Sequence, residues 1–271
     1  MNESEDFDRR DYIQSIERAI AVVTAFSDAG PFLSLSDLVA ATGLTKQTVR
    51  RILMTLERLG FARSVDYRWA LTPRMLSLGY AYLSSVNLPA AAQPVMEALT
   101  DRIGEGTSLA TLDDTEVVYL NRVQRHRITS INLAVGTRLP AHATSMGHVL
   151  LAGVSPKELD GYFDRAALHA LTDHTLTTRT ELTARLDLVR ARGWDAVDQE
   201  LELGRRSAAA PVHDADGRVV AALSLSCSTA SRSFDGLVAE LVPALVASAK
   251  QISAALGDGN YAHRNPRERA Q

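Results

Sequence analysis

Residues 45–71 read TKQTVRRILMTLERLGFARSVDYRWAL and contain two different patterns in succession. Across positions 46–59 the apolar residues recur every three or four places, which predicts a helix with one buried side. Gly60 is a residue type that can end such a helix. Across positions 61–71 apolar and polar residues alternate, which predicts a short hairpin with its turn near Asp66-Tyr67. The stretch therefore predicts a helix followed directly by a β-hairpin.

Two further helices are predicted on the N-terminal side of this stretch. Residues 12–26 place apolar side chains at helical spacing, and Gly30-Pro31 stops the helix. Residues 35–44 are predicted to contain a second, shorter helix, which Gly43 can end. The order of helix, helix, turn, helix and hairpin is that of a winged helix-turn-helix domain. The predicted caps are Ser34 or Ser36 and Gly43 for the second helix, and Thr45 or a neighbour for the third.

Positive charge is concentrated on the third helix and the hairpin. From Lys46 to Arg74 there are seven Lys or Arg and two Asp or Glu, a local charge of +5 in a chain whose net charge is −3. Duplex DNA is a polyanion, and its major groove admits a helix. A solvated basic face would explain the charge alone, but the order of elements favours DNA binding. The predicted DNA-binding residues are Ser36, Thr45, Lys46, Gln47, Thr48, Arg50, Arg51 and, on the wing against phosphates, Arg68.

The remaining sequence predicts a linker and a second domain. Pro73 can begin a linker helix, and residues 214–217 give a strong hairpin signal between two strands. Hairpin-paired strands separated from helices predict an antiparallel α+β, sensor-like domain. The predicted domains are 1–72 with a flexible arm at 1–11, a linker helix at 73–88, a C-terminal domain at 89–257 and a flexible tail at 258–271. The predicted strands are 107–113, 116–123, 130–133, 208–213 and 219–227, and the predicted helices are 90–103, 145–152, 156–162, 180–192 and 235–256.

Composition is that of a globular protein. The 271 residues, 46% of them hydrophobic, exclude a mainly disordered, collagen-like or membrane-spanning chain. The charged N-terminus has no targeting signal, and the apolar tract 237–256 is interrupted by charges, so we expect a cytoplasmic protein without a membrane span. The single cysteine, Cys227, excludes an intrachain disulfide and a multi-thiolate zinc site, and its apolar strand predicts a buried, inert thiol.

Enzymatic and metal chemistry are not expected. His142 and His148 lie six positions apart, which favours capping or surface roles over metal binding. Asp195, Asp198 and Glu200 follow a Gly-Trp turn, where acidic residues are usually solvated or capping. The sequence contains no nucleophile elbow, Walker A or dinucleotide-binding motif. No catalytic residue, metal or cofactor is therefore predicted.

Seven segments along the chain carry a family resemblance by their order and spacing. They are YIQSIERA (12–19), LSDL (35–38), TKQTVRRIL (45–53), LTPR (71–74), LPAHATSMG (139–147), GWDAVDQE (193–200) and LSLS (223–226). Together they resemble the IclR-type bacterial transcriptional regulators. Residues 12–26 and 71–85 are similar to the PcaR/PcaU/PobR branch, which regulates protocatechuate, 4-hydroxybenzoate and β-ketoadipate catabolism.

The resemblance implies a ligand-responsive regulator and no enzyme. It implies a winged-helix domain, a linker helix and a C-terminal effector domain related to the GAF/PAS folds. It also implies homodimers, commonly paired into dimers of dimers, on double-stranded operator DNA. The alternative is a constitutive DNA-binding repressor whose C-terminal domain serves only oligomerisation.

The resemblance further implies a pocket for a small organic acid at one end of the C-terminal sheet. A helix N-terminus favours an anion, and residues two apart on a strand share a face. The effector-binding residues implied are Ser145, Met146, Gly147, Asp198, Ser207, Ser224 and Ser226.

Three departures from glyoxylate-sensing relatives favour a larger, apolar acid. Ser207 replaces a Cys, Ser145-Met146 replaces Gly-Ala, and Val197 replaces an acidic residue. An aromatic acid such as 4-hydroxybenzoate or protocatechuate is therefore expected. Arg122, Arg125 or Arg127 is a further candidate to pair with the carboxylate near the entrance. Tyr80, Tyr82 and Leu83 are candidates for a linker–linker or inter-domain contact, or alternatively for burial within one subunit.

Overall fold

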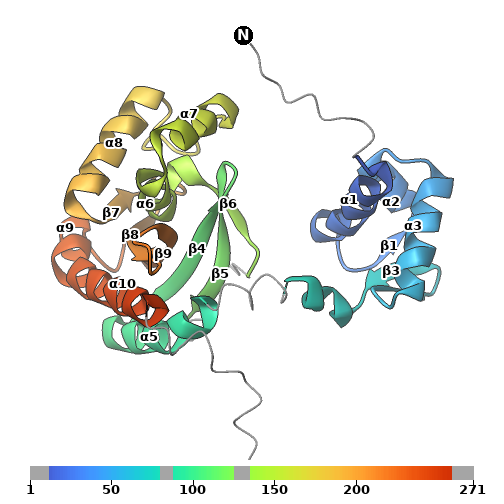
Figure 1. Ribbon diagram of the computed structural model, residues 1–271, viewed down its shortest axis with the longest axis horizontal. Coiled ribbons are helices and arrows are strands. Elements are labelled where there is room, and N and C mark those ends of the chain that lie inside the picture. The colour runs from blue at the N-terminus through green and yellow to red at the C-terminus, as the bar shows by residue number, and fades with distance from the viewer. Residues whose placement is uncertain (1–11, 80–87, 125–134, 258–271) are drawn as a thin grey trace, which may run out of the picture. The chain divides into compact units, whose positions relative to one another are not determined.

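The computed structural model describes residues 12–79, 88–124 and 135–257. The chain divides into two compact units, Met1–Ser85 and Val86–Gln271, which are described in turn (Figure 1). The boundary falls within the predicted linker, and the predicted strand at 130–133 lies outside the described residues.

The N-terminal unit packs three helices against a small antiparallel sheet. The helices are α1 (Gln14–Ala29), α2 (Leu35–Thr42) and α3 (Lys46–Arg58), and the strands in sheet order are β1 (Leu33–Ser34), β3 (Arg68–Leu71) and β2 (Ala62–Val65). Val22, Leu38, Val49 and Leu53 are fully buried between the helices, and Trp69 of the hairpin packs against them. The predicted winged helix-turn-helix order is confirmed. A 3₁₀ turn, Pro73–Met75, follows the hairpin.

Side-chain caps fix the two helices of the helix-turn-helix. Ser34, and not Ser36, caps α2: its hydroxyl accepts from the Asp37 N–H (3.2 Å), and the Asp37 carboxylate accepts from the Ser34 N–H (2.8 Å). Gly43 ends α2 in the left-handed region, with φ 66°. Thr45 caps α3, as predicted, by accepting from the Thr48 N–H at 3.3 Å. Reciprocal capping of this kind satisfies backbone donors that a helix start leaves unpaired.

The C-terminal unit is built on a six-stranded antiparallel sheet. The strands in sheet order are β6 (Arg138–Pro140), β5 (Glu116–Val123), β4 (Gly106–Asp113), β9 (Val219–Ser228), β8 (Arg205–His213) and β7 (Asp195–Asp198). The helices are α5 (Leu88–Ile103), α6 (Ser145–Gly153), α7 (Pro156–Arg165), α8 (Arg179–Arg192), α9 (Phe234–Gly236) and α10 (Val242–Gly257). The sequence analysis predicted no strand at the positions of β6 and β7, which are short strands at the two edges of the sheet.

Helices cover both faces of this sheet. α6 packs on β8 and β9 and against α8, whereas α5 and α10 pack on each other and on the opposite face (Figure 1). Alternation along β9 therefore points Ser224 and Ser226 toward the α6 side and the buried Leu223 and Leu225 toward α5 and α10. Cys227 is buried, as predicted, and burial raises the pKa of its thiol.

A buried ionic cluster attaches β7 to α6 and α8. The Asp195 side chain is fully buried, and its carboxylate accepts a hydrogen bond from Nδ1 of His148 at 2.6 Å. The same carboxylate pairs with Arg192 and, at 3.4 Å, with Arg185. Arg185 also pairs with Glu200 at 3.3 Å. Two arginines of α8 thus compensate two buried carboxylates, and His148 of α6 adds a hydrogen bond.

This cluster corrects the expectation of capping or surface roles for His142 and His148. Both are buried: Nε2 of His142 bonds to the carbonyl oxygen of His169 (3.0 Å), and Nε2 of His148 to that of His142 (2.7 Å). The expectation of a solvated or capping role for Asp195 and Glu200 is likewise wrong. Burial raises the pKa of Glu200 above its usual range, although nearby positive charges oppose the shift.

One helical segment, Phe234–Gly257, is long and apolar enough to cross a membrane among the residues described. It joins α9 to α10 through a π-helical turn, Leu237–Leu241. Pro243 has no backbone N–H to continue the regular ladder, which accounts for the irregular turn. Leu245 and Ile252 are fully buried, and α10 packs on β8 and α5, so this segment serves as a core helix.

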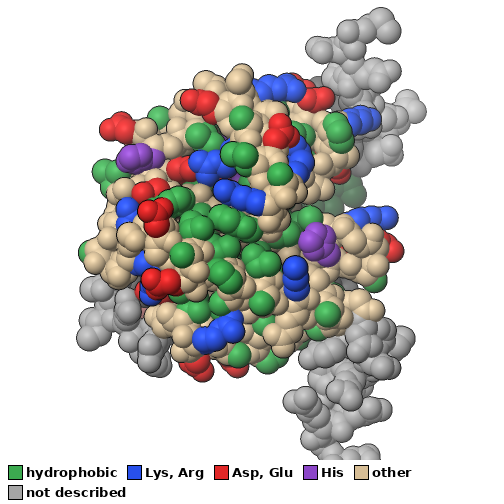
Figure 2. Space-filling view, turned by 90° about the vertical axis from the view of Figure 1, so that its left-hand side faces the viewer, with side chains coloured by type: hydrophobic (Ala, Val, Ile, Leu, Met, Phe, Trp, Pro, Cys, Tyr) green, Lys and Arg blue, Asp and Glu red, His purple; other side chains and the backbone are tan. Residues whose placement is uncertain are grey.

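Part of the apolar surface of this segment is exposed. One shallow hollow includes Trp194, Phe234 and Val238, and a second includes Pro243 and Ala244. Figure 2 shows the side of the molecule that bears α8, α9 and α10, with hydrophobic side chains gathered at its centre among Lys and Arg. Exposed apolar surface of this kind is typical of interaction sites.

Candidate functional site

The exposed side of α3 carries most of the predicted DNA-binding residues. Val49 and Leu53 are fully buried, which turns the opposite side of α3 to solvent. The exposed predicted residues on this helix are Lys46, Gln47, Arg50 and Arg51. A surface helix with this polar, basic side has the size and charge to enter a major groove.

The remaining predicted DNA-binding residues lie around this helix. Thr45 and Thr48 stand at the start of α3 with their hydroxyl oxygens 2.9 Å apart, so both also fix the helix end. Ser36 is exposed on α2, and Arg68 is exposed on β3. The bonds to Ser34 lower the pKa of Asp37, and the positive charge of Arg68 adds to the effect, which places Arg68 near the start of α2.

The hairpin is tied to α3 as well. The backbone N–H of Ser64, on β2, donates to Oε1 of Glu57 at 3.2 Å. Arg74 lies over the ring of Phe61, with 5.3 Å between the guanidinium carbon and the ring centroid. The exposed side of α3 and the basic hairpin therefore belong to one folded unit.

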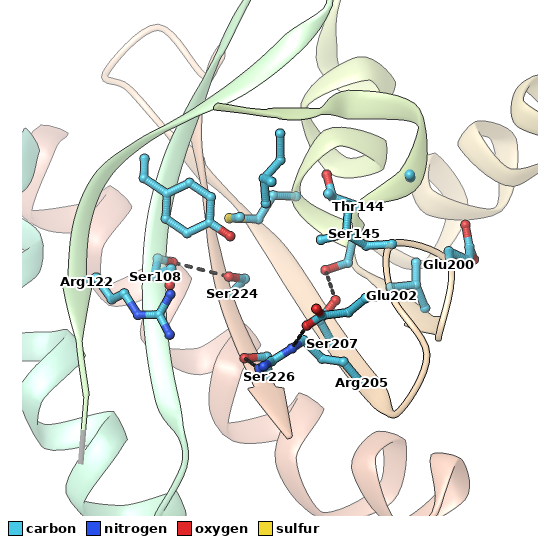
Figure 3. A pocket seen from close by; sticks show the side chains of 16 residues that line it. Ser108, Arg122, Thr144, Ser145, Glu200, Glu202, Arg205, Ser207, Ser224 and Ser226 are labelled. Atoms are coloured by element: carbon cyan, nitrogen blue, oxygen red, sulfur yellow. Dashed lines mark hydrogen bonds and ion pairs between the residues drawn. The ribbon is translucent and has the colours of Figure 1, made fainter. Parts of the chain in front are cut away.

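A cavity of about 210 Å³ opens at one end of the C-terminal sheet, beside the start of α6 (Figure 3). Its walls come from all six strands of the sheet, the turn between β7 and β8, and the start of α6 with the segment before it. Five of the implied effector-binding residues line it: Ser145, Met146, Ser207, Ser224 and Ser226. Arg122 lines it too, whereas Arg125 and Arg127 lie outside the described residues.

Serine hydroxyls form the polar floor of this cavity. The hydroxyl oxygens of Ser145 and Ser207 lie 3.0 Å apart, from α6 and β8. The Ser224 hydroxyl donates to the carbonyl oxygen of Ser108 at 3.5 Å, and Ser226 Oγ accepts from Nη1 of Arg205 at 3.5 Å. Figure 3 shows these side chains converging on the space between the strands and α6. Hydroxyls in this setting can bind a carboxylate without adding charge.

Two arginines border the same cavity. Burial lowers the pKa of Arg122, and the neighbouring positive charge of Arg205 adds to the shift. Arg205 is paired with Glu202. An anion placed near both guanidinium groups would be attracted by each and would reduce their mutual repulsion. The cavity is thus suited to the carboxylate of a small acid.

The opposite wall is apolar. Leu139, Met146, Val197 and Leu201 face the cavity together with Tyr119, whose phenol pKa is raised by burial. Apolar walls with a few convergent polar groups are typical of small-ligand sites. The volume lies below the usual ~300–1,000 Å³ of ligand pockets, which favours a compact ligand such as a monocyclic acid.

Gly147 and Asp198 do not line the cavity. Asp198 follows Val197 on β7, so its side chain points to the other face, where Arg206 binds its carboxylate through Nε (2.8 Å) and Nη2 (3.2 Å). The N–H of Gly147 donates to Oγ1 of Thr144 at 3.0 Å. Both residues therefore have structural contacts outside the cavity, and their implied ligand contacts stay a prediction.

The cavity residues that the sequence did not indicate include Ser108, Tyr119, Glu202 and Arg205. One of them could have been found: Arg205 lies two positions before Ser207 on a strand and must share its face. Ser108 and Tyr119 depend on the pairing of β4 with β5 and β9, and Glu202 on the turn between β7 and β8, which sequence periodicity does not specify.

Gly147→Ala tests the structural role of this glycine. A Cβ at position 147 would lie 1.9 Å from the carbonyl oxygen of Ala141, so the backbone must move. We expect Gly147→Ala to lower the free energy of unfolding by about 1–3 kcal/mol, measured by urea denaturation. Gly161→Ala on α7 is the control, because its Cβ would meet only the flexible end of Arg165 at 3.2 Å. A Gly147→Ala protein as stable as wild type would contradict the assignment.

Comparison with known proteins identifies the family. Residues 15–66 match the IclR helix-turn-helix domain, and residues 80–254 match the domain described as bacterial transcriptional regulator IclR C-terminal. The chain belongs to the IclR family. Its relatives are transcriptional regulators, a non-enzymatic group, which confirms the prediction that this IclR-family chain is not an enzyme.

Individual relatives support the resemblance to the PcaR/PcaU/PobR branch as well as membership of the family. The chain is 39% identical over 243 residues to the Pca regulon regulatory protein of Pseudomonas putida, covering 89% of this chain and 84% of that one. A putative transcriptional regulator from Rhodococcus sp. matches in structure with a TM-score of 0.81 and 44% identity over 90% of this chain and 98% of that one. An IclR homologue from Microbacterium hydrocarbonoxydans, solved with 4-hydroxybenzoate, matches with a TM-score of 0.79 and 26% identity. The match covers 89% of this chain and 98% of that one.

Proposed function

We propose that this IclR-family regulator controls a catabolic operon in response to a small aromatic acid such as 4-hydroxybenzoate or protocatechuate. The observation that carries the proposal is the cavity at the start of α6, where serine hydroxyls and two arginines face an apolar wall. The solved relative with bound 4-hydroxybenzoate adds support, because that ligand combines a carboxylate with an aromatic ring.

In the proposed complex the carboxylate lies toward Arg122, Arg205 and the serine hydroxyls. The ring lies against Met146 and Val197. Thr144 caps α6, and Ser145 and Met146 begin its first turn, where the helix dipole favours an anion.

The proposed response is a shift between two arrangements of a homo-oligomer on double-stranded operator DNA. Coupling between effector and DNA of this kind is typically about 1–3 kcal/mol. The predicted contacts of the linker, Tyr80, Tyr82 and Leu83, lie outside the described residues. The exposed apolar surface beside α9 and α10 supports self-association, for which we propose a homodimer and a dimer of dimers in the cytoplasm.

The decisive measurement is operator binding with and without 4-hydroxybenzoate, protocatechuate and β-ketoadipate, at fixed salt. The probe is DNA from immediately upstream of the regulator's own gene. A sequence-specific complex whose affinity changes severalfold with one acid is expected. Specific binding with no response to any acid, in a protein that these acids do not stabilise against heat, would favour the alternative of a constitutive repressor.

A further inference from the structure

The cavity at the start of α6 contains an ion pair of its own. Glu202 lies in the turn between β7 and β8, and its carboxylate binds Nε of Arg205, the first residue of β8. Both side chains line the cavity, and Arg205 also donates to Oγ of Ser226 at 3.5 Å. Figure 3 shows the two side chains in contact beside the serines. This guanidinium group therefore already has a carboxylate partner before any ligand binds.

The turn that carries Glu202 is fixed on both sides of this residue. The Gly204 N–H donates to Oε1 of Gln199 at 2.9 Å, and the Gln199 N–H donates to the carbonyl oxygen of Arg205 at 2.9 Å. The carbonyl oxygen of Gln199 accepts a hydrogen bond from the Thr172 hydroxyl at 2.7 Å. Because these bonds hold the backbone around it, Glu202 is a fixed part of the cavity wall.

The charged side chains around the cavity have a net charge of +1. Among the described residues that line it, the charged ones are Arg122, Arg205, Glu200 and Glu202. Glu200 lies 3.3 Å from Arg185 of α8, which is outside the lining and balances its charge. Glu202 balances Arg205 in the same way. Three arginines and two glutamates thus carry a net charge that a single carboxylate would neutralise.

These charges act on the same space. Burial raises the pKa of the Tyr119 phenol. The charges of Arg122 and Arg205 oppose this shift, and the charge of Glu202 adds to it. Tyr119 itself lines the cavity, so all three charged groups lie within electrostatic reach of a ligand beside its ring. A ligand carboxylate there is attracted by the arginines and repelled by Glu202.

We propose that Glu202 is a specificity-determining residue that restricts this cavity to acids with a single carboxylate. One carboxylate neutralises the site, whereas a second one would lie close to the Glu202 carboxylate or compete with it for Arg205. Carboxylates that share a partly buried site repel each other, and such repulsion can exclude a competing ligand. The inference rests on the proposed function and deepens it, because 4-hydroxybenzoate and protocatechuate carry one carboxylate and β-ketoadipate carries two.

The test compares ligands of different charge by isothermal titration of the full chain at fixed salt. Terephthalate has two carboxylates on a benzene ring, and 4-carbamoylbenzoate has nearly the same shape with one carboxylate replaced by an amide. We expect wild type to bind 4-carbamoylbenzoate at least about tenfold more tightly than terephthalate, because the diacid brings like charges together. Equal affinities for the two, whether tight or weak, would show that charge does not decide and would overturn the proposal.

Glu202→Gln keeps the size of the side chain and removes its charge. We expect this variant to reduce the preference for 4-carbamoylbenzoate to about threefold or less, chiefly by binding terephthalate more tightly. Its melting temperature should stay near that of wild type, since partly exposed ion pairs add little stability. An unchanged preference in Glu202→Gln would overturn the proposal even if wild type excludes terephthalate.

Glu116→Gln is the matched control. Glu116 also pairs with an arginine, Arg138, at 2.6 Å, and its side chain is exposed to a similar extent as that of Glu202, 39% against 35%, but it does not line the cavity. We expect both affinities to stay within about twofold of wild type. A loss of preference here as large as in Glu202→Gln would assign the effect to the net charge of the protein and contradict the proposal. Failure of wild type to bind 4-hydroxybenzoate, protocatechuate or any other acid tested would count against the proposed function itself.

Discussion

Asp195→Ala is expected to lower the free energy of unfolding of the C-terminal unit by about 3–5 kcal/mol. The Asp195 carboxylate is fully buried, compensates Arg185 and Arg192, and accepts a hydrogen bond from His148. Removing it leaves the His148 ring without its acceptor in a site that water does not reach. Urea unfolding followed by Trp194 fluorescence, in a Trp69→Phe background, would report this unit alone, since the chain has 2 tryptophans.

Asp198→Ala is the matched control for this experiment. Asp198 lies three residues further on the same strand and also pairs with an arginine, but its side chain is 36% exposed. Exposed ion pairs contribute only about 0–1 kcal/mol, so a small effect is expected. If the two substitutions lower the free energy of unfolding equally, the buried cluster contributes no more to stability than the exposed ion pair.

Arg122→Gln is expected to weaken effector binding by about 10- to 100-fold, which corresponds to the ~1.5–3 kcal/mol of a hydrogen bond to a charged group. The guanidinium of Arg122 borders the cavity, and glutamine keeps a polar side chain without the charge. Isothermal titration of the full chain with the acid that alters operator binding most would measure the dissociation constant. Operator affinity without the acid should stay unchanged.

Two other variants test whether the loss of affinity comes from the missing charge of Arg122 or from the loss of an arginine anywhere on the sheet. Arg138→Gln removes an exposed arginine that pairs with Asp113 and Glu116 on neighbouring strands, and its effect on ligand affinity should be within twofold. Arg122→Lys keeps the positive charge and should recover part of the lost affinity. A normal dissociation constant for Arg122→Gln would remove Arg122 from the carboxylate site.

Local sequence signals predicted the N-terminal unit closely. The cap at Thr45, the left-handed Gly43 and the turn at Asp66-Tyr67 all depend on residues within a few positions of each other. The apolar stripe through Val49 and Leu53 identified the buried side of α3. The structure was needed to choose between Ser34 and Ser36, because both serines stand near the start of the same short helix. It was also needed to find the two-residue strand β1.

The C-terminal unit was less predictable where polar side chains are buried. The sequence analysis placed the acidic residues of β7 in a surface turn, because it did not predict that Asp195 would be buried against Arg185 and Arg192 of α8 and hydrogen-bonded to His148, 47 residues earlier in the chain. The serine lining of the cavity came from the family resemblance and from strand alternation. Asp198 does not line the cavity, because it is one residue from Val197 on β7 and its side chain lies on the opposite face of the sheet. Gly147 does not line it either, and its N–H donates to Oγ1 of Thr144.

The central position of β9 in the sheet has a consequence for synthesis on the ribosome. Gly106 of β4 pairs with Ser226 of β9, so the middle of the sheet closes only after almost the whole C-terminal unit has been made. The N-terminal unit needs only short-range contacts and can fold first. A chain interrupted before residue 219 would have a finished DNA-binding unit and two separate parts of the second sheet, β6–β5–β4 and β8–β7. The edges of β4 and β8 that normally pair with β9 would be unpaired, which favours aggregation.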